Sequence, residues 1–187
     1  MNKAVFLDRD GVINRKAPGH DYIVDWREFE ILPGVLEAIR KLNQAAYRLI
    51  VVTNQRAVAK HKITLPELEQ IHQKLIAEVA RSGAVIDGIY FCPHDLDSKC
   101  GCRKPEPGML LRALKEFEID PRQSWMIGDS TVDIEAGRRA GCRTALIKAG
   151  WNKEGGAQGA DILAEDLYQA VEIILKARTA VPVPVSL

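Results

Sequence analysis

The chain has 187 residues and 26 lysines and arginines against 25 aspartates and glutamates, for a formal net charge of +1. This length predicts one domain with a buried core, and the balanced charge argues against a nucleic-acid-binding surface. Its first residues lack a secretory signal, and no run of about 18 apolar residues suggests a membrane segment, so we expect a cytoplasmic protein. We expect the domain to span 1–178 and the proline-interrupted residues 179–187 to form a flexible tail.

Buried strands alternate with helices along the chain. We expect strands at 3–8, 48–54, 88–92, 124–129 and 144–148, and helices at 34–46, 65–81, 108–117, 132–140 and 167–177. The second helix has the clearest signals, because Thr64 and Glu67 have capping-box spacing and Pro66 lies in the first turn. The alternation predicts an α/β fold, a Rossmann-like doubly wound parallel sheet with helices on both faces.

Polar side chains follow the carboxyl ends of these strands, where open parallel sheets bind ligands. They are, in chain order, Asp8, Asp10, Thr53, Lys104 and Asp129. Three carboxylates at one edge predict a Mg²⁺ site, and Lys104 and Thr53 offer the positive charge and the hydroxyl that a phosphoryl group needs. A turn or helix cap after the first strand would also explain Asp8 and Asp10 taken alone.

The sequences DRDGV, VVTNQ, CRKPEPG and IGDSTVD occur in this order at the strand ends. Together they resemble the four motifs of the haloacid dehalogenase (HAD) superfamily of phosphohydrolases, over roughly residues 3–150. The resemblance implies that Asp8 is the nucleophile that forms an aspartyl-phosphate. Asp10 would protonate the leaving alcohol and then take a proton from the attacking water. Asp8, Asp129 and the backbone carbonyl of Asp10 would hold Mg²⁺.

The same resemblance implies roles for the remaining motif residues. Thr53 and Asn54 would bind phosphoryl oxygens, and Lys104 would neutralise their charge. Asp133, one helical turn past Asp129, would orient Lys104 or a metal-bound water. The chemistry is consistent with these roles, because a carboxylate nucleophile splits one difficult step into two and positioned cations stabilise the charge of the transition state.

Three of the four cysteines lie in the segment CPHDLDSKCGC. Its candidate ligands are Cys92, His94, Cys100 and Cys102. The spacing C-x-H-x5-C-x-C suits a closed, structural tetrahedral Zn²⁺ site, which predicts a zinc loop at 92–102. A disulfide is the main alternative, but a cytoplasmic setting disfavours it and it would leave His94 unexplained. Scattered loop cysteines are the other alternative. We expect Cys142 to be a small core residue.

The chain has no room for a separate cap domain, so loops must form the substrate pocket. The candidate substrate contacts are His20, Asn54, Gln55, Arg56 and Arg103; for each charged side chain a solvated surface position is the alternative. The zinc loop narrows the resemblance to one subgroup of the superfamily. Within it, DYIVDWREFEILPGV is more similar to the phosphatases that remove the 7-phosphate of D-glycero-D-manno-heptose 1,7-bisphosphate, for cell-surface polysaccharide, than to histidinol-phosphate phosphatases. Another small sugar phosphate is a further alternative.

The loop after the second strand departs from the heptose-phosphatase pattern T-N-Q-S-G-I-A-R-G. Both glycines are replaced, by Ala57 and His61, and the loop arginine has become Lys60. Glycine allows backbone conformations that other residues avoid, so we expect a different loop shape. Lysine also lacks the two-pronged contact of arginine.

Two other classes of protein fit part of the pattern. A phosphoacceptor signalling domain would carry its aspartate after the third strand, whereas here it follows the first. A zinc-dependent interaction module would leave the carboxylates without a common purpose, and the charge balance argues against nucleic acid. We therefore expect a monomeric enzyme that acts on a small sugar phosphate, with no membrane partner.

Overall fold

The structure, a computed structural model, describes residues 1–19, 22–148 and 159–179. Its strands are β1 (Ala4–Leu7), β2 (Arg48–Asn54), β3 (Gly88–Cys92), β4 (Trp125–Gly128), β5 (Arg143–Ile147) and β6 (Ile162–Ala164). Its helices are α1 (Val35–Gln44), α2 (Leu65–Arg81), α3 (Gly108–Glu116), α4 (Thr131–Arg139) and α5 (Leu167–Thr179). Three short 3-10 helices connect them, η1 (Trp26–Glu28), η2 (Leu96–Ser98) and η3 (Pro121–Gln123). Helix α5 includes Thr179, the first residue of the predicted tail, and the rest of that tail, 180–187, lies outside the described residues.

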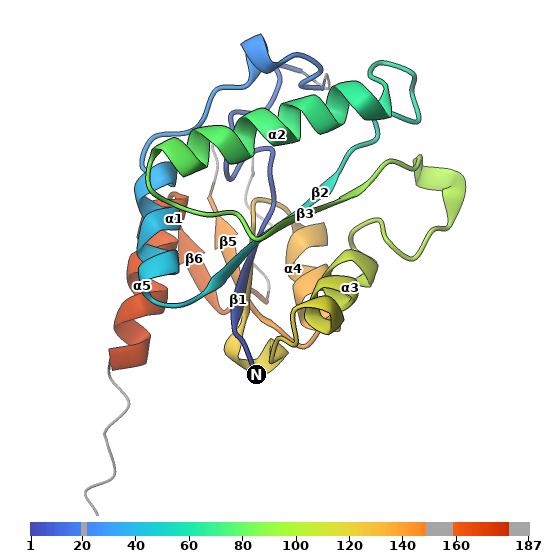
Figure 1. The fold of residues 1–187 in the computed structure, drawn as a ribbon. Coiled ribbons are helices and arrows are strands. Elements are labelled where there is room, and N and C mark those ends of the chain that lie inside the picture. The colour runs from blue at the N-terminus through green and yellow to red at the C-terminus, as the bar shows by residue number, and fades with distance from the viewer. Residues whose placement is uncertain (20–21, 149–158, 180–187) are drawn as a thin grey trace, which may run out of the picture.

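The six strands form one parallel sheet in the order β3-β2-β1-β4-β5-β6 (Figure 1). The predicted doubly wound fold is therefore confirmed. The chain runs outward from β1 to β2 and β3, then crosses back to β4 on the other side of β1. Sheets of this kind bind ligands where the direction of winding reverses, which here is the carboxyl end of β1. Strand β6 was missed by the sequence prediction, because three residues are too few to show a period.

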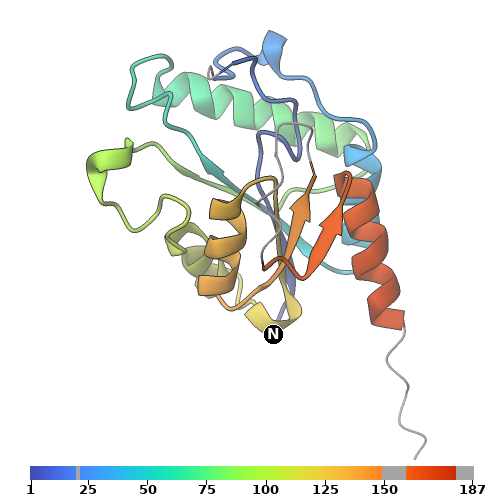
Figure 2. The ribbon, with the colours of Figure 1, turned by 180° about the vertical axis from the view of Figure 1, so that it is seen from behind.

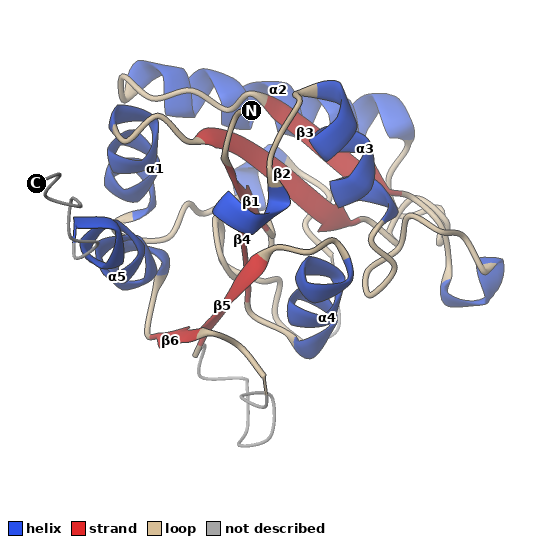
Figure 3. Ribbon diagram, turned by 90° about the horizontal axis from the view of Figure 1, so that it is seen from below, coloured by secondary structure: helices blue, strands red, loops and turns tan. Residues whose placement is uncertain are grey.

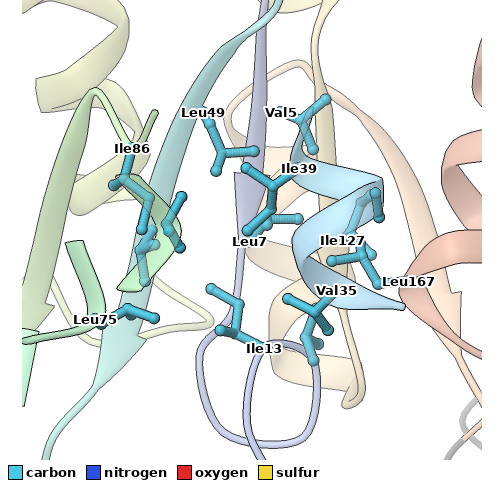
Figure 4. Close-up of a cluster of buried hydrophobic side chains, with 14 of the residues drawn as sticks. Val5, Leu7, Ile13, Val35, Ile39, Leu49, Leu75, Ile86, Ile127 and Leu167 are labelled. Atoms are coloured by element: carbon cyan, nitrogen blue, oxygen red, sulfur yellow. The ribbon is translucent and has the colours of Figure 1, made fainter. Parts of the chain in front are cut away.

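Helices cover both faces of the sheet, with α1, α2 and α5 on one face and α3 and α4 on the other (Figures 2 and 3). Alternate residues of β1 serve the two layers, because Val5 and Leu7 face the first and Phe6 faces the second. In Figure 4, Val5 and Leu7 lie among side chains of α1, including Val35 and Ile39. Burial on both faces explains why the strands read as continuous apolar runs.

The start of α2 has the capping box that its sequence predicts. The Thr64 side chain accepts a hydrogen bond from the backbone of Glu67, and the Glu67 carboxylate accepts one from the Thr64 N–H at 2.8 Å. One face of this helix packs into the core through Leu68, Leu75 and Val79. Among the helices that the structure describes, none is long and apolar enough to span a bilayer.

Candidate active site

Three carboxylates from two separate segments meet at the carboxyl edge of the sheet. Asp8 directly follows β1, and its N–H still donates to the carbonyl of Ile127 on β4 at 3.0 Å. Asp129 follows β4, and Asp133 lies in the first turn of α4. One carboxyl oxygen from each lies within 4.8 Å of the others, and all three residues are buried. The structure thus brings together Asp8 and Asp129, which the motifs place in one site.

The ammonium group of Lys104 links these carboxylates to the sheet. Its Nζ donates to Asp8 Oδ1 and to the carbonyl of Val52, both at 2.7 Å, and lies 2.6 Å from Asp133 Oδ1. Burial by itself would lower the pKa of Lys104, but the charges of Asp133 and Asp8 outweigh it and hold the pKa above its ordinary value. Lys104 is therefore a fixed positive charge beside Asp8.

The environment of Asp8 favours a bound cation. Burial raises the pKa of Asp8 to about 7; Lys104 opposes this shift, whereas Asp133 and Asp129 add to it. Carboxylate oxygens of Asp8 and Asp129 are the hard ligands that Mg²⁺ takes. Asp133 is already engaged, because its Oδ2 accepts the Ser130 N–H at 3.1 Å while its Oδ1 contacts Lys104. The donor set therefore fits Mg²⁺ held by Asp8 and Asp129, with Asp133 positioning Lys104.

The turn after β1 brings the backbone against Asp129. Gly11 has φ +100, and a Cβ atom there would lie 2.0 Å from Asp129 Oδ2. Glycine is thus required twice, for its conformation and for the close approach. The next part of this loop places Lys16 Nζ 2.6 Å from Asp129 Oδ2. Sequence reasoning missed this contact, because nothing in the local pattern distinguishes Lys16 from a solvated surface charge.

The carboxylate of Asp10 belongs to a second group of polar side chains. It accepts hydrogen bonds from Arg9 at 2.9 Å, from Asn14 Nδ2 at 2.9 Å and from Gln55 Nε2 at 3.1 Å. Burial alone would raise the pKa of Asp10, but the Arg9 charge and these hydrogen bonds lower it below its ordinary range. A side chain so engaged leaves the Asp10 backbone carbonyl as the group it would offer to a metal.

Two buried partners of this group were missed by the sequence analysis. The guanidinium of Arg9 is 1% exposed, and its NH1 lies 3.4 Å from Nε2 of His72 on α2. Its Cζ also lies over the ring of Phe29, 5.6 Å from the centroid. Burial, followed by the Arg9 charge, lowers the pKa of His72 to about 3, so this imidazole is neutral. The contact joins residues 63 positions apart, and no local signal predicts it.

The predicted substrate contacts after β2 are mostly occupied by the protein itself. The Asn54 amide donates to the Lys104 carbonyl and accepts from the Lys104 N–H, both at 3.1 Å. Gln55 is buried, and its Nε2 donates to Thr53 Oγ1 at 2.8 Å as well as to Asp10. Asn54 and Gln55 therefore orient Lys104, Thr53 and Asp10, a role that the sequence analysis did not assign to them.

The remaining predicted substrate contacts are Arg56, Arg103 and His20, of which the structure describes the first two. Arg56 Nε donates to Asp95 Oδ1 of the zinc loop at 2.5 Å. Arg103 precedes Lys104 in the sequence, and its NH1 donates to the carbonyl of His94 at 3.4 Å. His20 lies outside the described residues. The side chains of Arg56 and Arg103 thus both contact the zinc loop in this structure.

The loop that departs from the family pattern keeps one glycine-like conformation. His61 has φ +54, in the left-handed region that side chains disfavour, at one of the two positions where the family pattern has glycine. Ala57, at the other, is fully buried in the core. Histidine therefore adopts at position 61 a φ that glycine reaches without strain, and the expectation of a different loop shape stays a prediction.

The cysteine and histidine side chains of the zinc loop form one cluster. Cys92 Sγ lies 3.6 Å from Cys100 Sγ and 3.5 Å from His94 Nδ1, and Cys102 Sγ lies 3.3 Å from the same nitrogen. All four cysteines are free, so the disulfide alternative is wrong. Ligand bonds of about 2.0–2.3 Å in a tetrahedron place donor atoms about 3.3–3.8 Å apart, so the cluster fits Zn²⁺. Cys142 is buried in the core, as predicted.

A parallel sheet that carries an aspartate at its switch point, with a buried lysine and two further aspartates beside it, defines a HAD-like hydrolase. The HAD-hydrolase-like family model matches residues 101–170. The chain is 37% identical over 182 residues to the D-glycero-β-D-manno-heptose-1,7-bisphosphate 7-phosphatase of Pasteurella multocida, a match that covers 93% of this chain and 97% of the relative. It is 38% identical over 178 residues to the α-heptose enzyme of Mycobacterium tuberculosis H37Rv, covering 93% and 92%.

A solved structure supports the same relationship. The D,D-heptose 1,7-bisphosphate phosphatase from B. bronchiseptica, complexed with magnesium and phosphate, superposes with a TM-score of 0.86 at 34% identity, covering 94% of this chain and 99% of that one. The chain therefore belongs to the heptose-1,7-bisphosphate 7-phosphatase family of HAD phosphatases. It is a phosphatase, and neither the signalling-domain nor the interaction-module alternative is supported.

Proposed function

We propose that this phosphatase removes the 7-phosphate of D-glycero-D-manno-heptose 1,7-bisphosphate in a Mg²⁺-dependent reaction through an aspartyl-phosphate. The observation that carries the proposal is the contact of Lys104 Nζ with Asp8 Oδ1 at 2.7 Å, in a site that Asp129 completes. Relatives that match almost the whole chain are named for this substrate, and the B. bronchiseptica structure was solved with magnesium and phosphate.

In the first step, a carboxylate oxygen of Asp8 forms a bond to phosphorus while the bond from phosphorus to the sugar oxygen breaks. The leaving oxygen takes a proton from Asp10, which yields the free hydroxyl and an aspartyl-phosphate. In the second step, a water attacks phosphorus and gives a proton to Asp10. The bond from phosphorus to Asp8 then breaks, and inorganic phosphate leaves.

The surrounding side chains support these steps electrostatically. Lys104 places a positive charge beside the attacking oxygen, and the Thr53 hydroxyl, which accepts from Gln55, can donate its hydrogen to a phosphoryl oxygen. The hydrogen bonds to Asp10 favour its ionised form, which is the form needed to take a proton from water. The first step therefore requires that Asp10 take up a proton when substrate binds.

Two metal ions belong to the proposal. Asp8, Asp129 and the Asp10 carbonyl would hold Mg²⁺, which when bound neutralises phosphoryl charge and lets Asp8 ionise at neutral pH. Zn²⁺ held by the zinc-loop cluster would be structural, because four protein ligands close its coordination. The free cysteines are in keeping with a cytoplasmic location.

Loops would form the substrate pocket. We infer a single domain over 1–178 without a cap, so that the loop before α1, the segment after β2 and the zinc loop surround the sugar. We favour Arg103, which neighbours Lys104 in the sequence, as the side chain that meets the non-reacting part of the substrate, followed by Arg56 and by His20. A monomer contains every residue that the mechanism uses.

Phosphate release tests the proposed substrate. The full chain would be assayed with the α and β anomers of heptose 1,7-bisphosphate and with histidinol phosphate, with and without Mg²⁺, and ³¹P NMR would identify the phosphate removed. We expect Mg²⁺-dependent loss of the 7-phosphate and little turnover of histidinol phosphate. Preference for histidinol phosphate, or loss of the 1-phosphate, would overturn the assignment.

A further inference from the structure

Two cations of the segment 55–61 share one carboxylate of the zinc loop. Asp95 Oδ1 accepts from Arg56 Nε at 2.5 Å, and Asp95 Oδ2 lies 2.8 Å from Lys60 Nζ. The carboxylate is itself fixed, because Oδ1 also accepts the N–H of Leu96 at 2.6 Å. Asp95 directly follows the candidate zinc ligand His94. We call the contacts of Asp95 with Arg56 and Lys60 the Asp95 latch.

A second contact ties the same two segments together nearer the reacting centre. The N–H of Gln55 donates to the carbonyl of the candidate zinc ligand Cys92 at 2.8 Å. The side chain of Gln55 then donates to Thr53 Oγ1 and to Asp10. A continuous series of contacts thus runs from the zinc cluster, through the segment 55–61, to the groups proposed to bind the phosphoryl group and transfer protons.

We propose that Asp95 is a positioning residue whose latch couples the zinc site to substrate binding, by fixing the segment 55–61 against the zinc loop. This inference rests on the proposed function. Zinc would order the loop that carries Asp95, and Asp95 would hold Arg56 and Lys60 at the rim of the pocket. Thr53 and Lys104 have separate supports in the sheet and in Asn54, so the latch acts on binding rather than on the chemical step.

The geometry separates the latch from an ordinary surface ion pair. The side chains of Arg56, Lys60 and Asp95 are only 29%, 44% and 31% exposed. One carboxylate serves two cations and a backbone N–H, so its removal frees both ends of the segment at once. Two half-exposed ion pairs of this kind support a coupling of about three- to tenfold in affinity.

The test compares Asp95→Asn with Asp87→Asn in the full chain. Asp87 is a matched control, because its carboxylate also accepts from an arginine, Arg48, at 2.6 Å and from the backbone N–H of Leu49 at 2.7 Å, but at the opposite end of β3. For Asp95→Asn we expect KM for the sugar bisphosphate to rise about three- to tenfold with kcat within about twofold of wild type. Asp87→Asn should leave both constants unchanged.

Zinc removal provides the second arm. Stripping zinc with a chelator should raise KM in the wild type and in Asp87→Asn, but should raise it less in Asp95→Asn, where the latch is already broken and only the contact of Gln55 with the Cys92 carbonyl still joins the two segments. Hydrogen exchange of the segment 55–61 should rise to a similar level on zinc removal and in Asp95→Asn. Asp95→Glu, which restores the charge, should recover part of the protection.

Unchanged KM and exchange in Asp95→Asn would overturn the proposal, as would equal effects of zinc removal in Asp95→Asn and in the wild type. The exchange measurement needs no substrate. If the chain fails to hydrolyse heptose bisphosphate, the proposed function falls, and protection of 55–61 still decides whether the latch exists.

Discussion

Lys104→Met removes the charge on which the site depends while keeping an apolar side chain of similar length. The ammonium lies 2.7 Å from Asp8 Oδ1 and 2.6 Å from Asp133 Oδ1, and its side chain is 2% exposed. Loss of one positioned donor from a transition state costs about 3 kcal/mol, so kcat should fall about 10²–10³-fold. Removing one partner of a buried ion pair costs about 3–5 kcal/mol of stability, out of a total of about 5–15 kcal/mol.

Adding Asp133→Asn separates the loss of kcat from the loss of stability. In the wild type, the ammonium of Lys104 contacts two carboxylates, Asp8 and Asp133. The Lys104→Met/Asp133→Asn protein lacks the ammonium and keeps only one of these carboxylates, Asp8. The asparagine at position 133 can still accept the Ser130 N–H. We expect urea unfolding without added Mg²⁺ to show a destabilised single variant and a partly restored double variant. Phosphate release should stay low in both. If Lys104→Met unfolds at the wild-type urea concentration and works within about tenfold of the wild-type rate, the reasoning is refuted.

The remaining predictions concern proton transfer, loop strain and acid stability. Asp10→Asn should lower kcat about 10²–10⁴-fold with substrate binding retained, and a near-normal rate would contradict its acid-base role. His61→Gly should raise the free energy of unfolding by about 1 kcal/mol, because φ +54 strains histidine, whereas Lys62→Gly next to it should not stabilise the protein. Folding lowers the pKa of His72 from 6.5 to about 3, so protonation of His72 favours the unfolded chain. The contribution of neutral His72 to the free energy of unfolding should therefore be complete above pH 6.5 and should decrease as the pH falls toward 3. Urea unfolding between neutral and acid pH should show a shallower loss in His72→Gln, and an identical slope would show that His72 does not contribute.

Much of the fold could be predicted because its signals are local. The apolar runs of β1, β2 and β4 follow from burial on both faces, and the cap of α2 follows from Thr64 and Glu67. Strand β6 was missed because it is three residues long and is defined by pairing with β5 rather than by a period of its own. Tertiary pairing, not propensity, decides such a short strand.

In the candidate site, too, the sequence predicts the residues set by local signals but not those set by long-range packing. Asp8, Thr53 and Asp129 stand at strand ends, where the topology itself brings them to one edge. Lys104 reaches the same edge from the connection between the zinc loop and α3. The residues that orient them are set by long-range packing, as when Arg9 meets His72 from α2 and Asp95 meets Arg56 from another loop. Gln55 was expected to contact substrate; in the structure its buried side chain donates to Asp10 and Thr53, a role that its sequence position did not indicate. Sequence alone does not separate a buried from an exposed polar loop residue.

Trapping the phosphoryl group on Asp8 tests the central claim most directly. The wild-type protein and the Asp10→Asn protein, which lacks both the acid of the first step and the base of the second, would be mixed with heptose bisphosphate and Mg²⁺. Each would be quenched in acid within one wild-type turnover, digested and analysed by mass spectrometry with fragmentation. We predict a phosphoryl group on Asp8, and none in the Asp8→Asn protein treated in the same way. Two results would contradict the account. One is that the wild-type protein releases phosphate within that turnover while Asp8 never carries a phosphoryl group. The other is that the phosphoryl group is found on a different residue.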